Sequence, residues 1–181
     1  IKGLDDVIPL FRTFQDADLV IAGDGNHGEV LRRIAAGAPS VKFLGRVAPA
    51  DLARWYRHAQ ALVVPSVCFE TFGIILIESM KRGTPVIARR IGPFPEIVEA
   101  SGGGELFDGP EELLAAMQRL LADPARRRAL GRAGQEAQQR LLTTWHAKHL
   151  VSQRVLAYDT TNFYTYIAST NTRTRLAQRG H

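Results

Sequence analysis

The sequence predicts an α/β fold built on a parallel β-sheet, and two patterns along the chain support this prediction. Apolar runs of strand length alternate with amphipathic stretches of helix length over roughly residues 1–142. The apolar runs end at glycine, proline or small polar residues, which is where strands commonly give way to loops. Such alternation is typical of βα units, whose strands run parallel and whose helices cover both faces of the sheet. We therefore expect a Rossmann-like domain over residues 1–142, with ligands bound beyond the carboxyl ends of the strands.

The first third of the chain contains two of the predicted strands. A helix is predicted directly after Lys2-Gly3, because apolar residues recur there at helical spacing. Its apolar face is formed by Leu4, Val7, Ile8, Phe11 and Phe14. The predicted strands are residues 19–22 and 41–44, and an amphipathic helix follows over residues 51–59. Trp55 and Tyr56 in that helix have the spacing of core residues, and we expect them to be buried.

A glycine-rich string follows the first strand and matches a nucleotide-binding pattern. Residues 23–28, Gly-Asp-Gly-Asn-His-Gly, satisfy the Gly-x-Gly-x-x-Gly fingerprint of dinucleotide-binding proteins. That fingerprint also requires an acidic residue about 20 positions on, at the end of the next strand, to bind a ribose. The next predicted strand, residues 41–44, is followed by Gly45-Arg46, and no acid occurs from there until Asp51. We therefore do not expect an NAD site.

The central stretch, Pro65 to Glu78, combines a strand end, a short loop and a helix start. The apolar run 61–64 predicts a buried strand, Glu70 falls in the loop, and Gly73 opens an apolar helix. Backbone N–H groups and the positive end of the helix dipole bind anions at such a place. Glu78 lies roughly 7 to 8 Å along the helix axis from Gly73. Two carboxylates thus bracket an anion-binding helix start, as is needed to hold both ends of a nucleoside diphosphate sugar. The alternative is a structural helix with two acids, but a carboxylate on so apolar a helix needs a partner.

The second half of the chain continues the alternation of strands and helices. Residues 86–88 and 105–107 are predicted strands, and residues 89–96 a loop rich in Gly and Pro. Helices are predicted to start near Asp108-Gly109-Pro110 and at Asp123-Pro124. The residues of the latter helix predicted to face inward are Leu130, Ala133, Ala137 and Leu141. A last helix over Trp145 to Tyr158 and a poorly packed tail over residues 159–181 complete the prediction, so residues 143–181 form a separate C-terminal part.

Length, charge and cysteine content limit the possible functions. A chain of 181 residues that begins with Ile1 is too short for two Rossmann-like domains, and we interpret it as a fragment or a processed piece. Residues 1–118 carry 12 basic and 15 acidic side chains, whereas residues 119–181 carry 11 basic and 3 acidic ones. The single cysteine, Cys68, excludes an internal disulfide framework and fits a reducing compartment. No apolar run is long enough to span a membrane.

The central stretch resembles the Glu-(seven residues)-Glu motif of retaining glycosyltransferases of family 4. The matching residues are Glu70-Thr71-Phe72-Gly73 and Glu78, and the likeness extends over about residues 2–142. This family has the two-domain GT-B fold, and the resemblance implies that the chain is the C-terminal, donor-binding half, without the N-terminal acceptor domain. The Arg-(four residues)-Lys-Gly motif of the family is matched at Lys2-Gly3 only, because its arginine would lie upstream of Ile1.

The resemblance implies a role for each matching residue. Glu70 would contact the donor sugar and Lys2 would bind the diphosphate, so these two are the predicted catalytic residues. Glu78 would hold the ribose hydroxyls. The remaining donor-binding residues that the resemblance implies are Gly23, Gly25, Val47, Ser66, Phe72, Gly73, Ile74 and Ile75. The loop 89–96 departs from the family pattern, since Gly92-Pro93-Phe94 is stiffer and bulkier than the usual glycine-rich sequence.

The activity implied is transfer of a sugar from a nucleoside diphosphate sugar to an acceptor hydroxyl, with retention at the anomeric carbon. Two other readings stay open: a nonenzymatic nucleotide-sugar-binding module, and a GT-B nucleotide-sugar epimerase. No metal or other cofactor is expected. Asp16-Ala17-Asp18 matches a metal-binding Asp-x-Asp pattern, but it precedes a strand rather than following one.

The expected partners follow from the same reasoning. A nucleoside diphosphate sugar is the expected donor, the acceptor is not specified, and no nucleic acid is expected because aromatic and basic residues are not interleaved. The basic C-terminal part is a candidate for peripheral contact with an anionic membrane, with a solvated helix surface as the alternative. We expect a cytoplasmic protein, with a peripheral location at the inner face of the membrane as an alternative.

Overall fold

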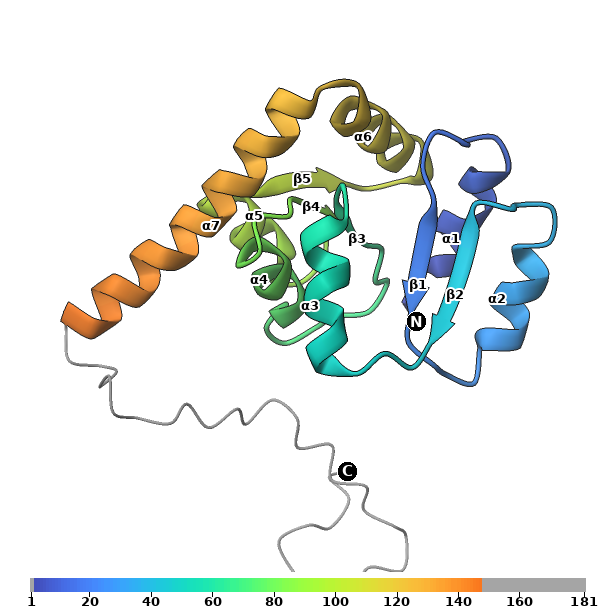
Figure 1. Ribbon diagram of the computed structural model, residues 1–181, viewed down its shortest axis with the longest axis horizontal. Helices are drawn as coiled ribbons and strands as arrows, with labels where there is room; N and C mark the ends of the chain where they lie inside the picture. Colours follow the sequence, from blue (N-terminus) through green and yellow to red (C-terminus); the bar gives the residue numbers. More distant parts are fainter. Residues whose placement is uncertain (1, 148–181) are drawn as a thin grey trace, which may run out of the picture. The chain divides into compact units, whose positions relative to one another are not determined.

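The structure is a computed structural model that describes residues 2–147 of the 181-residue chain. The chain divides into two units, Ile1–Thr144 and Trp145–His181, and almost all described residues belong to the first (Figure 1). Of the helix predicted over Trp145–Tyr158, only the first three residues are described, and the predicted tail 159–181 lies outside the described residues.

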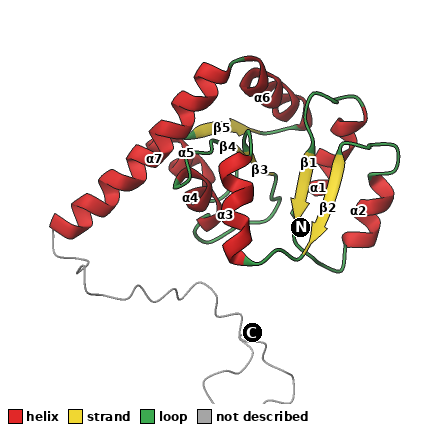
Figure 2. Ribbon diagram, in the orientation of Figure 1, coloured by secondary structure: helices red, strands yellow, loops and turns green. Residues whose placement is uncertain are grey.

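Strands and helices alternate along the first unit, as Figure 2 shows. In chain order the elements are α1 (Leu4–Val7), the 3-10 helix η1 (Ile8–Arg12), β1 (Leu19–Ala22), α2 (Gly28–Ile34), β2 (Val41–Gly45), α3 (Pro49–His58), β3 (Leu62–Val64), α4 (Ile74–Met80), β4 (Val86–Arg89), α5 (Phe94–Ser101), β5 (Gly104–Phe107), α6 (Pro110–Ala122) and α7 (Pro124–Ala147). Every strand is followed by a helix, which is the arrangement that βα units require.

The strands pair in parallel, so the predicted fold class is confirmed. β1 pairs with β2, with Leu19 opposite Val41. β4 lies between β3 and β5, where Ile87 is opposite both Val63 and Glu105. The ladders divide the five strands into two hydrogen-bonded sheets, whereas the sequence predicted a single sheet. The two sheets share a core, because Leu19 of β1 and Val63 of β3 pack against the same apolar cluster.

Side chains of β4 alternate between two apolar clusters, which shows that helices cover both faces of its sheet. Val86 and Ala88 belong to one cluster, whose helical members are Leu76 and Met80 of α4 and Phe94 and Val98 of α5. Ile87 belongs to the other, whose helical members are Val7 of α1, Phe11 of η1 and Leu113, Ala116, Met117 and Leu120 of α6. α3 and α4 contact each other beside β3 (Figure 1). Tyr56 of α3 is buried as predicted, but Trp55 is 44% exposed.

Two glycines allow α7 to lie close to α4 and to the turn that follows it. A Cβ atom on Gly131 would overlap the carbonyl oxygen of Gly83, and one on Gly134 would lie 2.8 Å from Met80 Cγ. Of the residues predicted to face inward, Leu130, Ala133 and Ala137 are partly buried, but Leu141 is 48% exposed. The prediction for Leu141 was wrong because the close approach of α7 is made by its small residues, and Leu141 lies beyond them.

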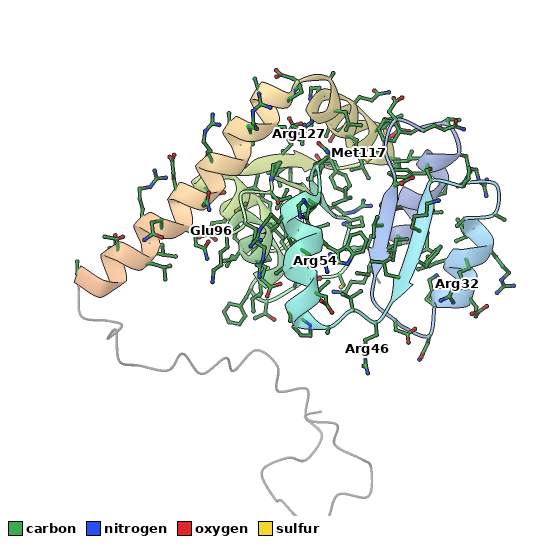
Figure 3. All side chains as sticks on the ribbon, in the orientation of Figure 1. Arg32, Arg46, Arg54, Glu96, Met117 and Arg127 are labelled. Carbon is green, nitrogen blue, oxygen red and sulfur yellow. The ribbon has the colours of Figure 1, made fainter. Side chains whose placement is uncertain are left out.

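Charged contacts join α6, α7 and β5. Arg127 of α7, labelled in Figure 3, donates a hydrogen bond of 2.7 Å to the carbonyl oxygen of Leu120 in α6. The buried carboxylate of Glu105 pairs with Arg119 at 2.7 Å and with Arg126 at 3.0 Å. A buried carboxylate requires such partners, so these contacts fix the C-terminal helices to the sheet that carries the central loop.

Candidate functional site

The loop between β3 and α4 carries four of the eleven predicted site residues, Ser66, Glu70, Phe72 and Gly73. Pro65 and Ser66 are buried at the end of β3, whereas Phe72 is 65% exposed and Phe69 is 83% exposed. Gly73 then begins α4 with φ 63°, a left-handed conformation that favours glycine. A Cβ atom there would lie 2.9 Å from Ile97 Cδ1, the end of a flexible side chain, so the backbone conformation is the main reason for glycine at this position. The loop therefore returns to the protein body at Gly73, and α4 starts there as predicted.

Three polar side chains, Lys2, Ser66 and Glu70, form one hydrogen-bonded group at this loop. Lys2 Nζ lies 2.6 Å from Glu70 Oε1, and Ser66 Oγ donates a hydrogen bond of 2.8 Å to the same oxygen. Burial of Glu70 raises the pKa of its carboxyl group, but the hydrogen bonds from Lys2 and Ser66 outweigh that effect and lower it. Glu70 is therefore an ionised carboxylate held in one orientation, with 22% of its side chain exposed.

Gly3 explains how Lys2, at the start of the chain, reaches Glu70. Its φ is 70°, and a Cβ atom would overlap the carbonyl oxygen of Pro65. The backbone of the Lys2-Gly3 turn thus lies directly against the end of β3. This close approach places Lys2 beside the loop that carries Ser66 and Glu70.

The lowered pKa of Glu70 predicts a specific pH dependence of folding stability. A carboxylate whose pKa is lower in the folded than in the unfolded state adds stability above its unfolded pKa, and this stability is lost as the pH falls through the folded pKa. We expect the Glu70→Gln variant to be less stable than the wild type at pH 7 and the difference to shrink in acid. Urea unfolding of both proteins from pH 7 downward measures it. If the difference in the free energy of unfolding between the two proteins stayed constant with pH, ionisation of Glu70 would make no contribution to folding stability.

Glu78 lies in α4 and is accompanied by Tyr56 and Arg82. Tyr56 Oη donates a hydrogen bond of 3.4 Å to Glu78 Oε2. Burial and the adjacent Glu78 carboxylate raise the pKa of Tyr56 to about 12, so the phenol stays protonated and remains a donor. Arg82 donates to the backbone carbonyl of Glu78 at 2.7 Å and lies over the Tyr56 ring. The Glu78 side chain remains exposed, which leaves it accessible to a ligand.

The ends of β1 and β2 enclose a small hollow of about 130 Å³. It is lined by Ala22, Gly23, Asp24, Arg46, Val47 and Leu52. The two strand ends are joined by a hydrogen bond of 2.7 Å from the Gly23 N–H group to the Gly45 carbonyl. Arg46 is exposed and its side chain extends outward from this end of β2 (Figure 3). Gly23 and Val47 thus lie together, whereas Gly25 is exposed outside the hollow.

The sequence analysis missed two residues that contact the site residues or the segments that carry them, Tyr56 and Arg89. Tyr56 was expected to be only a core residue, and Arg89 was assigned to a loop, whereas it is the last residue of β4. The one local signal for Arg89 was an arginine directly after three buried apolar residues, a place where a charged side chain needs partners.

In the part of the chain that the structure describes, no group of three or more His, Cys, Asp or Glu side chains forms a metal site. No helix among these residues is long and apolar enough to cross a membrane.

Comparison with known protein families places the chain among glycosyltransferases. The family described as "Glycosyl transferases group 1" matches residues 1–137. D-inositol 3-phosphate glycosyltransferase of Corynebacterium kroppenstedtii is 37% identical over 114 residues, which cover 62% of this chain and 25% of that protein. Phosphatidyl-myo-inositol mannosyltransferase of Mycobacterium leprae is 32% identical over 160 residues, which cover 87% of this chain and 41% of that protein. The chain therefore spans less than half the length of these relatives.

Solved structures show the same fold. Sucrose-phosphate synthase (tll1590) from Thermosynechococcus elongatus matches 82% of this chain with a TM-score of 0.69 and 30% identity, over 42% of its own chain. Anabaena Alr3699/HepE, solved in complex with UDP-glucose, matches 82% of this chain and 45% of its own with a TM-score of 0.70 at 24% identity. The C-terminal domain of LpcC from Francisella tularensis, a group 1 family glycosyl transferase, matches 80% of this chain and 80% of its own with a TM-score of 0.66 at 22% identity. The chain belongs to the group 1 glycosyl transferases, family 4, and has the fold of the C-terminal half of their GT-B architecture.

Proposed function

We propose that this chain is the donor-binding half of a retaining glycosyltransferase, which transfers a sugar from a nucleoside diphosphate sugar to an acceptor hydroxyl. The observation that carries the proposal is the group Lys2, Ser66 and Glu70, held by hydrogen bonds beside the start of α4. Family membership supports the reaction type, and the UDP-glucose held by Alr3699/HepE supports the class of donor.

The diphosphate would lie between Lys2 and the start of α4. The first N–H groups of a helix have no acceptor within the helix, so those of Ile74 and Ile75 suit phosphate oxygens. Phe72 and Gly73 bring the backbone to this point, and the left-handed conformation of Gly73 turns it into the helix. Negative charge grows on the diphosphate as it leaves. A preorganised ammonium group and backbone N–H groups would stabilise that charge in the transition state, in the place that a metal ion has in other enzymes.

The sugar would be held by Glu70. Its carboxylate is ionised and fixed in orientation, so it accepts hydrogen bonds from sugar hydroxyl groups and stabilises positive charge at the anomeric carbon. Ser66 holds the carboxylate oxygen from the protein side. In the reaction the bond from the anomeric carbon to the diphosphate oxygen breaks, and a bond to the acceptor oxygen forms on the same face. The acceptor's hydroxyl proton passes to the departing diphosphate.

The nucleoside would be bound on the other side of the diphosphate. Glu78 would accept hydrogen bonds from the ribose hydroxyls, and Tyr56 would orient that carboxylate. The base would lie against Val47, near the hollow at the ends of β1 and β2, with Gly23 and Gly25 leaving room for the donor. Since the acceptor in this family is bound by the other half of the GT-B fold, we expect this chain alone to bind donor weakly and to turn over inefficiently.

The ribose contact gives a direct test of this proposal. We expect calorimetric titration of the chain to show binding of UDP or GDP, and we expect the 2′-deoxy form of the bound nucleotide to bind about tenfold more weakly, since a hydrogen bond to a charged group contributes about 1.5 kcal/mol or more. The Glu78→Gln variant should lose most of this preference.

Glu111→Gln is the matched control, because Glu111 is exposed in the first turn of α6 and its substitution removes the same negative charge as Glu78→Gln does. Absence of binding by both diphosphates would contradict the proposed function. An unaltered preference for ribose in Glu78→Gln would contradict the role of Glu78 alone.

A further inference from the structure

Arg89 connects three separate segments at the end of its sheet. Its Nη2 lies 2.8 Å from Asp6 Oδ2 of α1. Its Nε donates to the carbonyl oxygen of Pro65 at the end of β3 at 3.2 Å, and its Nη1 donates to that of Asp108 after β5 at 3.1 Å. The guanidinium also lies over the ring of Phe107, 5.2 Å from its centroid, and the side chain is 16% exposed. Arg89 is therefore a nearly buried cation whose three side-chain nitrogen atoms all have partners in other segments of the chain.

Two of the three segments that Arg89 joins are next to Lys2 and Glu70 in the sequence. Asp6 lies in α1, which starts one residue after Gly3, and Pro65 is followed directly by Ser66. The Lys2-Gly3 turn already lies against the Pro65 carbonyl, the same group to which Arg89 donates. Arg89 thus contacts both α1 and the end of β3, the two segments next to Lys2 and Glu70 in the sequence.

We propose that Arg89 is a positioning residue, which keeps Lys2 against Glu70 by fixing α1 to the end of β3. The consequence for donor binding rests on the proposed function, while the positioning role does not. Arg89 is unsuited to bind the diphosphate itself, because its guanidinium is engaged on three sides and little of it is exposed. Lysine at this position would not replace it, since a lysine ammonium lacks the planar fork that reaches three acceptors at once.

The ionisation of Glu70 reports whether Lys2 is in place. The hydrogen bonds from Lys2 and Ser66 lower the pKa of Glu70 against the effect of burial, so withdrawal of Lys2 must raise it. Carbon-detected NMR titration of the Glu70 carboxyl group in the intact chain measures this pKa. We expect Arg89→Met to shift the titration midpoint upward and Arg89→Lys to restore little of the loss.

Asp6→Ala separates positioning from direct electrostatics. Removing the negative charge of Asp6 would by itself favour the ionised form of Glu70 and lower its pKa. Loss of the Asp6 contact with Arg89 would instead release Lys2 and raise the pKa of Glu70. We expect a rise, and we expect it to vanish in the Lys2→Met background, because a residue that acts through Lys2 has nothing to act on there.

Arg90→Met is the matched control, because it removes the same charge and the Arg90 side chain pairs with the carboxylates of Glu99 and Asp108 rather than with Lys2, Ser66 or Glu70. It should leave the Glu70 midpoint in place. A fall or no change of the midpoint in Asp6→Ala, or an equal rise in Arg89→Met with and without Lys2, would overturn the proposal. Asp6→Ala keeps the test decisive if Arg89→Met does not fold, since Asp6 lies at an exposed position.

The binding measurement connects positioning to function. We expect Arg89→Met and Asp6→Ala to weaken UDP or GDP binding by roughly five- to tenfold, within the range of coupling between contacting groups. If the wild-type chain binds neither nucleotide, the proposed function fails, while the Glu70 titration still decides the role of Arg89. If the midpoint shifts as expected but nucleotide affinity does not, the effect of Arg89 on donor binding is excluded.

Discussion

Replacement of Lys2 by methionine is expected to weaken the binding of UDP or GDP to this chain by about 10- to 100-fold. A hydrogen bond between charged groups contributes about 1.5 to 3 kcal/mol, and each 1.4 kcal/mol is a factor of ten in affinity. Lys2 also neutralises Glu70, with Nζ 2.6 Å from Oε1. Without the ammonium group, the Glu70 carboxylate would repel the diphosphate that binds beside it. Both effects act in the same direction, which is why this variant has the largest expected effect on binding.

Lys42→Met is the matched control for this change. Lys42 is exposed in β2, and its ammonium group donates to the carbonyl oxygen of Pro39. Its replacement by methionine therefore removes one positive charge, as Lys2→Met does, but at a place away from the site. NMR titration reaches the millimolar affinities that such variants require. We expect Lys42→Met to bind as the wild type does. Equal weakening in both variants would show that general charge, rather than the Lys2 contact, attracts the nucleotide.

The salt dependence of binding is a second readout of the same contact. A contact between Lys2 and the diphosphate is screened by added salt, so wild-type affinity should fall as the salt concentration rises. The Lys2→Met variant should show a smaller fall. Parallel salt dependence in the two proteins would contradict a direct contact.

The sequence indicated most of the central loop because its signals are local. A strand end, a glycine and an apolar helix follow one another between residues 61 and 80, and each is recognised by its own composition. Gly73 is an example, since a residue with φ 63° at a helix start is most readily glycine. The contact between Lys2 and Glu70 joins residues 68 positions apart. No periodicity shows such a pair, and only the resemblance to a family predicted that both residues contact the same donor.

Arg89 was not predicted because its partners are scattered along the chain. Asp6, Pro65 and Asp108 are 83, 24 and 19 residues away from it, and they meet only when the sheet forms. Spacing also misplaced Trp55 and Leu141, since a helical repeat gives the apolar face of a helix but not how far its neighbours extend. Both side chains are about half exposed, at 44% and 48%.

The close approach of α7 predicts the largest effect on stability, in the Gly131→Ala variant. Alanine in a helix interior is about 1 kcal/mol more favourable than glycine, so helix propensity alone predicts stabilisation. Against this, the new Cβ atom would overlap the carbonyl oxygen of Gly83, a backbone atom in a turn where Gly83 has φ 73°. Backbone cannot rotate away as a side chain does, so α7 would have to move outward. Overpacking costs typically about 1 to 3 kcal/mol and sometimes more. We expect a net loss of about 1 to 2 kcal/mol and a fall of several degrees in Tm.

Gly134→Ala and Arg132→Ala give the graded comparison for thermal and urea unfolding. At Gly134 the nearest atom is Met80 Cγ at 2.8 Å, which belongs to a flexible side chain and can shift. We therefore expect a smaller loss there, and little change in Arg132→Ala, whose side chain is exposed on α7. If Gly131→Ala instead raised the Tm, helix propensity would dominate, and α7 could not lie as close to the Gly83 turn as the structure places it. Because Gly83 ends the segment that carries Glu78 and Arg82, a displaced α7 should also loosen α4, so that weaker nucleotide binding would accompany the loss of stability.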